Sequence, residues 1–114
     1  MQEVRTPRFH RPKTAVPLSE AAISKVCTRW KIDELFLFGS VLSNSFHADS
    51  DIDIMVKFSS DAQVGLFEFV EIKQELEGIF NRKVDIMTKQ SIERSRNLVR
   101  RKEILESAKL VYAS

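Results

Sequence analysis

Three aspartates lie in two short apolar segments, and their spacing predicts a shared acidic face. Asp51 and Asp53 are two residues apart in the segment 51–58, where apolar residues alternate with them. Because side chains alternate across a strand, both carboxylates are expected to leave the same face. Asp85 lies between two apolar residues in the segment 84–88. If these two segments are neighbouring strands in register, Asp85 lies beside the other two aspartates.

A face with three carboxylates indicates a site for a divalent cation. Carboxylates held close together in a partly apolar site resist ionisation unless a cation compensates their charge. Mg²⁺ prefers oxygen ligands and is often held by a few carboxylates together with substrate phosphates. The alternative is that the aspartates form the solvated side of a half-exposed sheet.

The dipeptide Gly39-Ser40 ends the apolar segment 34–38 and is a candidate phosphate-binding turn. Glycine allows a ligand to approach the backbone closely. A helix is expected to begin at Val41-Leu42, and the amides of its N-terminus, with the Ser40 hydroxyl, could bind phosphate oxygens. An ordinary turn is the alternative interpretation.

Strands and helices alternate along the chain. Strands are predicted over 34–38, 51–58 and 84–88, and helices from Ser19, over 64–80 and after residue 88 with a break at 95–97. This order predicts an α/β (α+β) domain, a small mixed β-sheet packed by helices. The buried positions expected in the last segment are Leu98, Ile104, Leu105, Ala108 and Val111.

Two parts of the chain are distinguished by their patterns. Residues 1–17 contain three prolines and no periodicity, so they are predicted to form a basic, extended N-terminal arm. Residues 18–114 are predicted to form a single domain, which suits the length of the chain. The first helix of this domain places Cys27 on its apolar stripe, so core packing is expected of this residue.

Composition excludes several classes of protein. The single cysteine cannot form an intramolecular disulfide, which favours a reducing, cytoplasmic location. No apolar run is long enough for a transmembrane helix, so no membrane contact is expected. The net charge is only +2, with basic ends and an acidic middle, which is atypical of a general nucleic-acid binder.

Taken together, these motifs resemble the minimal nucleotidyltransferase (MNT) family of the DNA-polymerase-β-like superfamily. The resemblance rests on Gly39-Ser40, on Ser-Asp-Ile-Asp-Ile at 50–54, on Arg-Lys-Val-Asp-Ile-Met-Thr at 82–88 and on the segment 104–112. It covers approximately residues 19–113 and implies the polymerase-β-like nucleotidyltransferase fold.

The resemblance also implies roles for individual residues. Gly39 and Ser40 would hold the phosphates of a nucleoside triphosphate. Asp51 and Asp53 would ligate Mg²⁺, and Asp85 would complete the catalytic metal site and help to activate the acceptor hydroxyl. All three aspartates are therefore predicted to be both catalytic and metal-binding residues.

One departure from the family pattern concerns the phosphates. Many members of the family have an arginine and a second glycine just after the Gly-Ser pair, whereas this chain has Val-Leu-Ser-Asn at 41–44. A lysine or arginine from residues 89–101 is the candidate replacement.

The function implied by the resemblance is transfer of AMP from ATP to a protein hydroxyl. The acceptor would be a tyrosine of a cognate HEPN-domain toxin, a ribonuclease, so that this chain would act as its antitoxin. One alternative is a non-catalytic antitoxin that neutralises its partner by binding. Another is nucleotidyl transfer to a small molecule.

Overall fold

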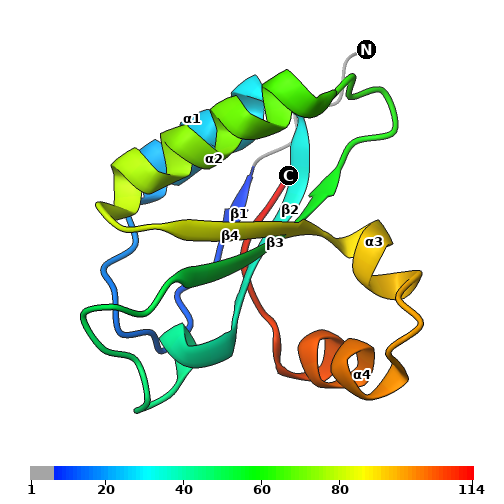
Figure 1. The fold of residues 1–114 in the computed structure, drawn as a ribbon. Coiled ribbons are helices and arrows are strands. Elements are labelled where there is room, and N and C mark those ends of the chain that lie inside the picture. Colours follow the sequence, from blue (N-terminus) through cyan, green and yellow to red (C-terminus); the bar gives the residue numbers. More distant parts are fainter. Residues whose placement is uncertain (1–6) are drawn as a thin grey trace.

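The computed structural model describes residues 7–114, in which five strands form one sheet with helices on both of its sides (Figure 1). The elements in chain order are β1 (Arg8–Phe9), α1 (Glu20–Arg29), β2 (Ile32–Phe38), the 3₁₀ turn η1 (Gly39–Leu42), β3 (Ile52–Phe58), α2 (Leu66–Phe80), β4 (Val84–Thr88), α3 (Lys89–Glu93), α4 (Leu98–Ser107) and β5 (Lys109–Ala113). No helix in residues 7–114 combines the length and the apolar character needed to cross a membrane.

The sheet is mixed, as predicted. Its strand order is β1-β5-β2-β3-β4, and only the pair β3–β4 is parallel. Parallel neighbours need a crossover connection. Helix α2 provides this connection, since it runs between β3 and β4 in the sequence.

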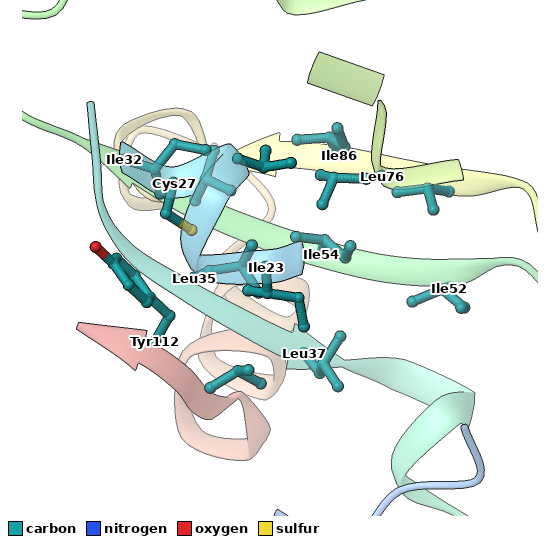
Figure 2. Close-up of a cluster of buried hydrophobic side chains, with 14 of the residues drawn as sticks. Ile23, Cys27, Ile32, Leu35, Leu37, Ile52, Ile54, Leu76, Ile86 and Tyr112 are labelled. Carbon is teal, nitrogen blue, oxygen red and sulfur yellow. The ribbon is translucent and has the colours of Figure 1, made fainter. Parts of the chain in front are cut away.

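Helices α1 and α2 lie side by side over one face of the sheet and cover the main core (Figure 1). Ile52, Ile54 and Val56 of β3 are fully buried in this core, and Ile23 of α1 and Leu76 of α2 pack in the same cluster. Figure 2 shows Ile23, Leu76 and Ile54 converging from the two helices and from β3. Burial of this apolar surface is the main source of stability.

Helix α1 begins as the sequence predicts. The Ser19 side chain caps it by accepting a hydrogen bond from the Ala22 N–H at 3.3 Å. Ile23, Val26 and Cys27 are the buried residues of the helix. Burial raises the pKa of the Cys27 thiol to about 12, which is consistent with a packing role and not with a reactive thiolate.

A second, smaller core lies on the opposite face of the sheet. Met55 points away from Ile54 because side chains alternate along β3. Met55 packs with Phe38 of β2, Ile92 of α3 and Ile104 of α4. Helices α3 and α4 are therefore attached to the face that α1 and α2 leave free.

The C-terminal segment differs from the prediction in two respects. Residues 109–113 form strand β5, which pairs with β2, although the sequence pattern favoured a continuing helix. Val111 is buried as expected, but it is buried within the sheet. Leu98 and Leu105 were predicted to be buried and are exposed, at 62% and 36% of their surface. Helix α4 buries Ile104 alone, because only one side of this short helix faces the sheet.

The described part of the predicted arm is extended and contacts the domain. Arg8 and Phe9 form β1 and pair with β5, and the Ala15 N–H donates to the Val41 carbonyl at 3.0 Å. Val16 is buried in the main core. Residues 1–6 of the arm lie outside the described residues.

Candidate active site

Asp51 and Asp53 lie at the beginning of β3, on the face away from the main core. Asp51 directly precedes the strand, and Asp53 is its second residue. Their neighbours Ile52 and Ile54 are fully buried on the other face. Asp53 is half-buried and Asp51 is exposed. The alternation of side chains along β3 therefore places both carboxylates on one side, as the sequence predicts.

Asp85 of β4 is the direct partner of Asp53 in the parallel register. The adjacent pairs are Ile52 with Val84 and Ile54 with Ile86, all of them buried. Side chains of register partners leave the same face of a sheet. The register therefore places Asp85 beside Asp53, as predicted. The catalytic and metal-binding roles of Asp51, Asp53 and Asp85 remain predictions.

The Gly39-Ser40 turn follows β2, the other neighbour of β3, and lies beside Asp53. Phe38, the last residue of β2, is the register partner of Asp53, so the chain turns at Gly39 directly beside this carboxylate. Gly39 has a φ of 78°, which disfavours any residue with a side chain. A Cβ atom at this position would also collide with Oδ2 of Asp53. The backbone conformation therefore favours glycine, and a side chain at this position would have to displace the Asp53 carboxylate.

The turn after Gly39 is shorter than predicted. The sequence favoured a helix beginning at Val41-Leu42, whereas the structure has the four-residue 3₁₀ turn η1 over Gly39–Leu42. The Ser40 carbonyl closes the turn by accepting from the Ser43 N–H at 2.9 Å and from the Ser43 hydroxyl at 3.1 Å. Val41 is fully buried in the main core, which fixes the turn against the sheet.

The electrostatics of Asp53 indicate that the three carboxylates interact. Burial raises the pKa of Asp53 above its ordinary value, and the charges of Asp85 and Asp51 raise it further. The positive charge of Arg100 acts in the opposite direction. A half-buried carboxylate with two like charges nearby and one guanidinium opposing them is typical of sites that bind cations and phosphates.

The chemistry of these residues fits a hard divalent cation. The donors are carboxylate oxygens, which Mg²⁺ prefers, and their mutual repulsion would be relieved by a bound cation. Within residues 7–114, no three acidic, histidine or cysteine side chains already surround one point closely enough to hold an ion. Asp51 and Asp85 are exposed, so their side chains can rotate toward a cation without disturbing the core.

Sequence reasoning missed the residue that supports the loop before Asp51. Arg82, in the turn between α2 and β4, donates from Nη1 to the carbonyl oxygens of His47, Ala48 and Ser50 at 3.1, 3.2 and 3.3 Å. Its guanidinium also lies over the Phe46 ring, 4.5 Å from the centroid. A basic residue in a turn carries no sequence signal for such a role, because its partners lie far away in the chain.

A cavity of about 570 Å³ lies away from the aspartates, at the other end of β3 and β4. Its lining includes Val56 and Lys57 of β3 and Thr88 of β4, and it includes none of the three aspartates. This cavity is therefore separate from the acidic face, where Asp51 and Asp85 are exposed.

A family model described as a nucleotidyltransferase domain matches residues 20–111 of the chain. The matched region includes all five predicted site residues. Among the described elements it also includes every helix and the strands β2, β3 and β4, and it ends within β5.

Two archaeal proteins are similar to part of the chain. Protein MJ1379 of Methanocaldococcus jannaschii is 39% identical over 64 residues, which are 56% of this chain and 64% of that protein. The protein adenylyltransferase MntA of Thermococcus cleftensis is 33% identical over 64 residues, which are 56% of this chain and 63% of that protein. The matched region thus spans less than two thirds of either relative.

Solved structures share the fold over most of the chain. A minimal nucleotidyltransferase is 30% identical, with a TM-score of 0.61, and the match covers 79% of this chain and 85% of that one. A toxin–antitoxin complex solved with AMP-PNP gives a TM-score of 0.63 at 22% identity, covering 85% and 75%. An MNT antitoxin complex with the tri-AMPylated HEPN toxin of Shewanella oneidensis gives 0.55 at 24% identity, covering 83% and 70%.

Proposed function

The chain belongs to the nucleotidyltransferase domain family, and we propose on this basis that it transfers AMP from ATP to a hydroxyl group of a partner protein. The observation that carries the proposal is the position of Asp53, which lies between the Gly39 turn and Asp85. The order β2-β3-β4 puts Asp53 between this turn on one side and Asp85 on the other.

This order gives each residue a part in the reaction. Phosphates bound at Gly39 and Ser40 lie next to Asp53, and an acceptor hydroxyl that approaches across β4 meets Asp85. Asp51, Asp53 and Asp85 would hold Mg²⁺, which would supply positive charge to neutralise the charge that develops during phosphoryl transfer.

The chemical step is an in-line displacement at the α-phosphorus of ATP. The acceptor oxygen forms a bond to this phosphorus, the bond to the bridging oxygen of the β-phosphate breaks, and pyrophosphate leaves. Asp85 accepts the proton of the hydroxyl group. Positioning and charge neutralisation carry most of the catalysis, so the protein needs no covalent intermediate.

The acceptor we propose is a tyrosine of a HEPN-domain toxin encoded with this chain. Support comes from the related protein named an adenylyltransferase and from the similar fold of an MNT antitoxin bound to an AMPylated HEPN toxin. AMP adds negative charge and bulk. Near the active site of a ribonuclease, these would repel and obstruct RNA, and the chain would thereby act as an antitoxin.

The double variant Asp51→Asn/Asp53→Asn tests the proposal. The chain is incubated with its HEPN partner, Mg²⁺ and ATP labelled at the α-phosphate, and the label on the partner is measured. We expect labelling by the native chain, none by the double variant and none in EDTA. Asp49→Asn, an exposed change in the same loop, is the matched control and should leave labelling intact.

Protection of cells from the toxin separates catalysis from simple binding. The proposal requires that the double variant bind the toxin without neutralising it. Full protection by the double variant would instead establish the non-catalytic antitoxin. Labelling that persists in EDTA would exclude the metal site.

A further inference from the structure

We propose that Arg100 of α4 binds the polyphosphate of the donor nucleotide. This inference rests on the proposed function, because it concerns the same site. It identifies the basic group that the residues after Gly39-Ser40 do not provide, since the segment 41–44 contains no lysine or arginine.

Helix α4 is fixed on the sheet face that carries the aspartates. Its buried residue Ile104 packs with Phe38 and Met55. Phe38 directly precedes Gly39, and Met55 lies two residues after Asp53 on the same face of β3. Figure 1 shows α3 and α4 together on the side of the sheet away from α1 and α2. The packing of Ile104 therefore places α4 on the face of the sheet that carries Asp53.

Arg100 lies on the side of α4 that faces this site. It is four residues before Ile104, and residues four apart share one side of a helix. A cavity of about 270 Å³ between α3, α4 and β4 is lined by Arg100 and Ile104 together with Met87. Met87 lies two residues after Asp85, on the same face of β4. Arg100 and the carboxylates thus border the same surface.

The guanidinium of Arg100 is available to a ligand. In the part of the chain that the structure describes, its side chain forms no hydrogen bond or ion pair. The next residue, Arg101, has a structural role instead, because its Nη1 donates to the Glu93 carbonyl at 3.1 Å.

The chemistry of the two groups is complementary. A guanidinium presents a planar array of donors that matches phosphate oxygens and can bind them bidentately. The exposure of Arg100 permits a ligand to approach its guanidinium.

Binding of ATP and of AMP to the 114-residue chain tests this role. Affinities are measured by calorimetry in Mg²⁺ for the native chain, Arg100→Gln, Arg100→Lys and the control Lys102→Gln, an exposed change on the same helix. We expect Arg100→Gln to weaken ATP binding about tenfold or more, equivalent to about 1.4 kcal/mol. AMP binding by Arg100→Gln should change less than about twofold, because AMP lacks the β- and γ-phosphates. Arg100→Lys should restore part of the lost ATP affinity. The control Lys102→Gln should bind ATP as the native chain does.

Several outcomes would overturn the inference. ATP affinity in Arg100→Gln equal to that of the native chain removes the role of Arg100 and leaves the proposed function standing. An equal loss for ATP and AMP also overturns it, because polyphosphate contact must discriminate between them. A native chain that binds neither nucleotide refutes the proposed function and this inference together. Thermal unfolding of each variant establishes that the comparison is made between folded proteins.

Discussion

Asp53 and Asp85 are register partners across the parallel strands β3 and β4, so two carboxylates leave the sheet side by side. Such proximity is costly in the absence of a cation, because like charges disfavour ionisation. The raised pKa of Asp53 reflects this cost together with that of burial. The sheet thus holds an electrostatic strain that a bound cation would relieve.

The first prediction concerns the stability of the metal-free protein. A carboxyl group whose pKa is raised by folding destabilises the folded state once it ionises. Asp53→Asn removes this penalty, so its unfolding temperature in EDTA should exceed that of the native chain at pH 7. As the pH falls through the raised pKa, Asp53 becomes protonated and the difference should disappear toward the unfolded-state value of 3.8.

Thermal unfolding followed by circular dichroism at several pH values measures this difference. Asp49→Asn controls for the loss of one negative charge in the same region. A native chain that is more stable than Asp53→Asn in EDTA at neutral pH would show that the carboxylate makes a stabilising contact instead.

The second prediction concerns the close approach of Gly39 to Asp53. Gly39→Ala places a side chain in a left-handed conformation, which costs about 1–2 kcal/mol, and forces its Cβ against Oδ2 of Asp53. We expect a less stable protein and loss of AMP transfer, measured by urea unfolding and by the labelling assay.

Gly78 of α2 offers a matched control for this substitution. A Cβ atom at Gly78 meets nothing within 4 Å, and alanine is the better helix former. Gly78→Ala should therefore stabilise the chain by about 0.5–1 kcal/mol and leave transfer unchanged. If Gly39→Ala and Gly78→Ala changed the free energy of unfolding and AMP transfer equally, Gly39 would have no special role beside Asp53.

The third prediction separates the chemical role of Asp85 from a structural one. Its side chain is exposed, so Asp85→Asn should change the free energy of unfolding by no more than about 0.5 kcal/mol. Because Asp85 is proposed to accept the proton of the acceptor hydroxyl, its replacement should reduce the rate of AMP transfer by at least about 100-fold. Single-turnover labelling and chemical unfolding measure the two effects. If Asp85→Asn instead lost its cooperative unfolding transition and lost activity in proportion, Asp85 would have a structural role.

The fourth prediction concerns Arg82, which holds the loop before Asp51 through three backbone carbonyls. Arg82→Ala should allow Asp51 to move, so that transfer falls by about 10- to 100-fold and half-saturation requires more Mg²⁺. The adjacent, exposed Lys83 provides the control, since Lys83→Ala removes the same charge without touching the loop. An unchanged Mg²⁺ dependence in Arg82→Ala would refute the positioning role.

Much of the fold follows from local patterns. The strand segments 34–38, 51–58 and 84–88 agree with β2, β3 and β4, and Ser19 caps α1 as its position predicts. Strand β5 could not be predicted in this way. Its five residues become a strand because β2 and β1 provide partners on both sides, and these partners outweigh local helical preference.

The sequence by itself determined which side chains share a face, because the two-residue period of a strand is a local property: Asp51 and Asp53 had to leave one side of β3. Only the tertiary structure decided that Asp85 pairs with Asp53, that the Gly39 turn touches the same carboxylate and that α4 packs on the same face of the sheet. The physical reason is that register and helix docking depend on the fit of the whole core. Ile104 of α4, packed against Phe38 and Met55, brings Arg100 to residues from which it is far removed in the chain.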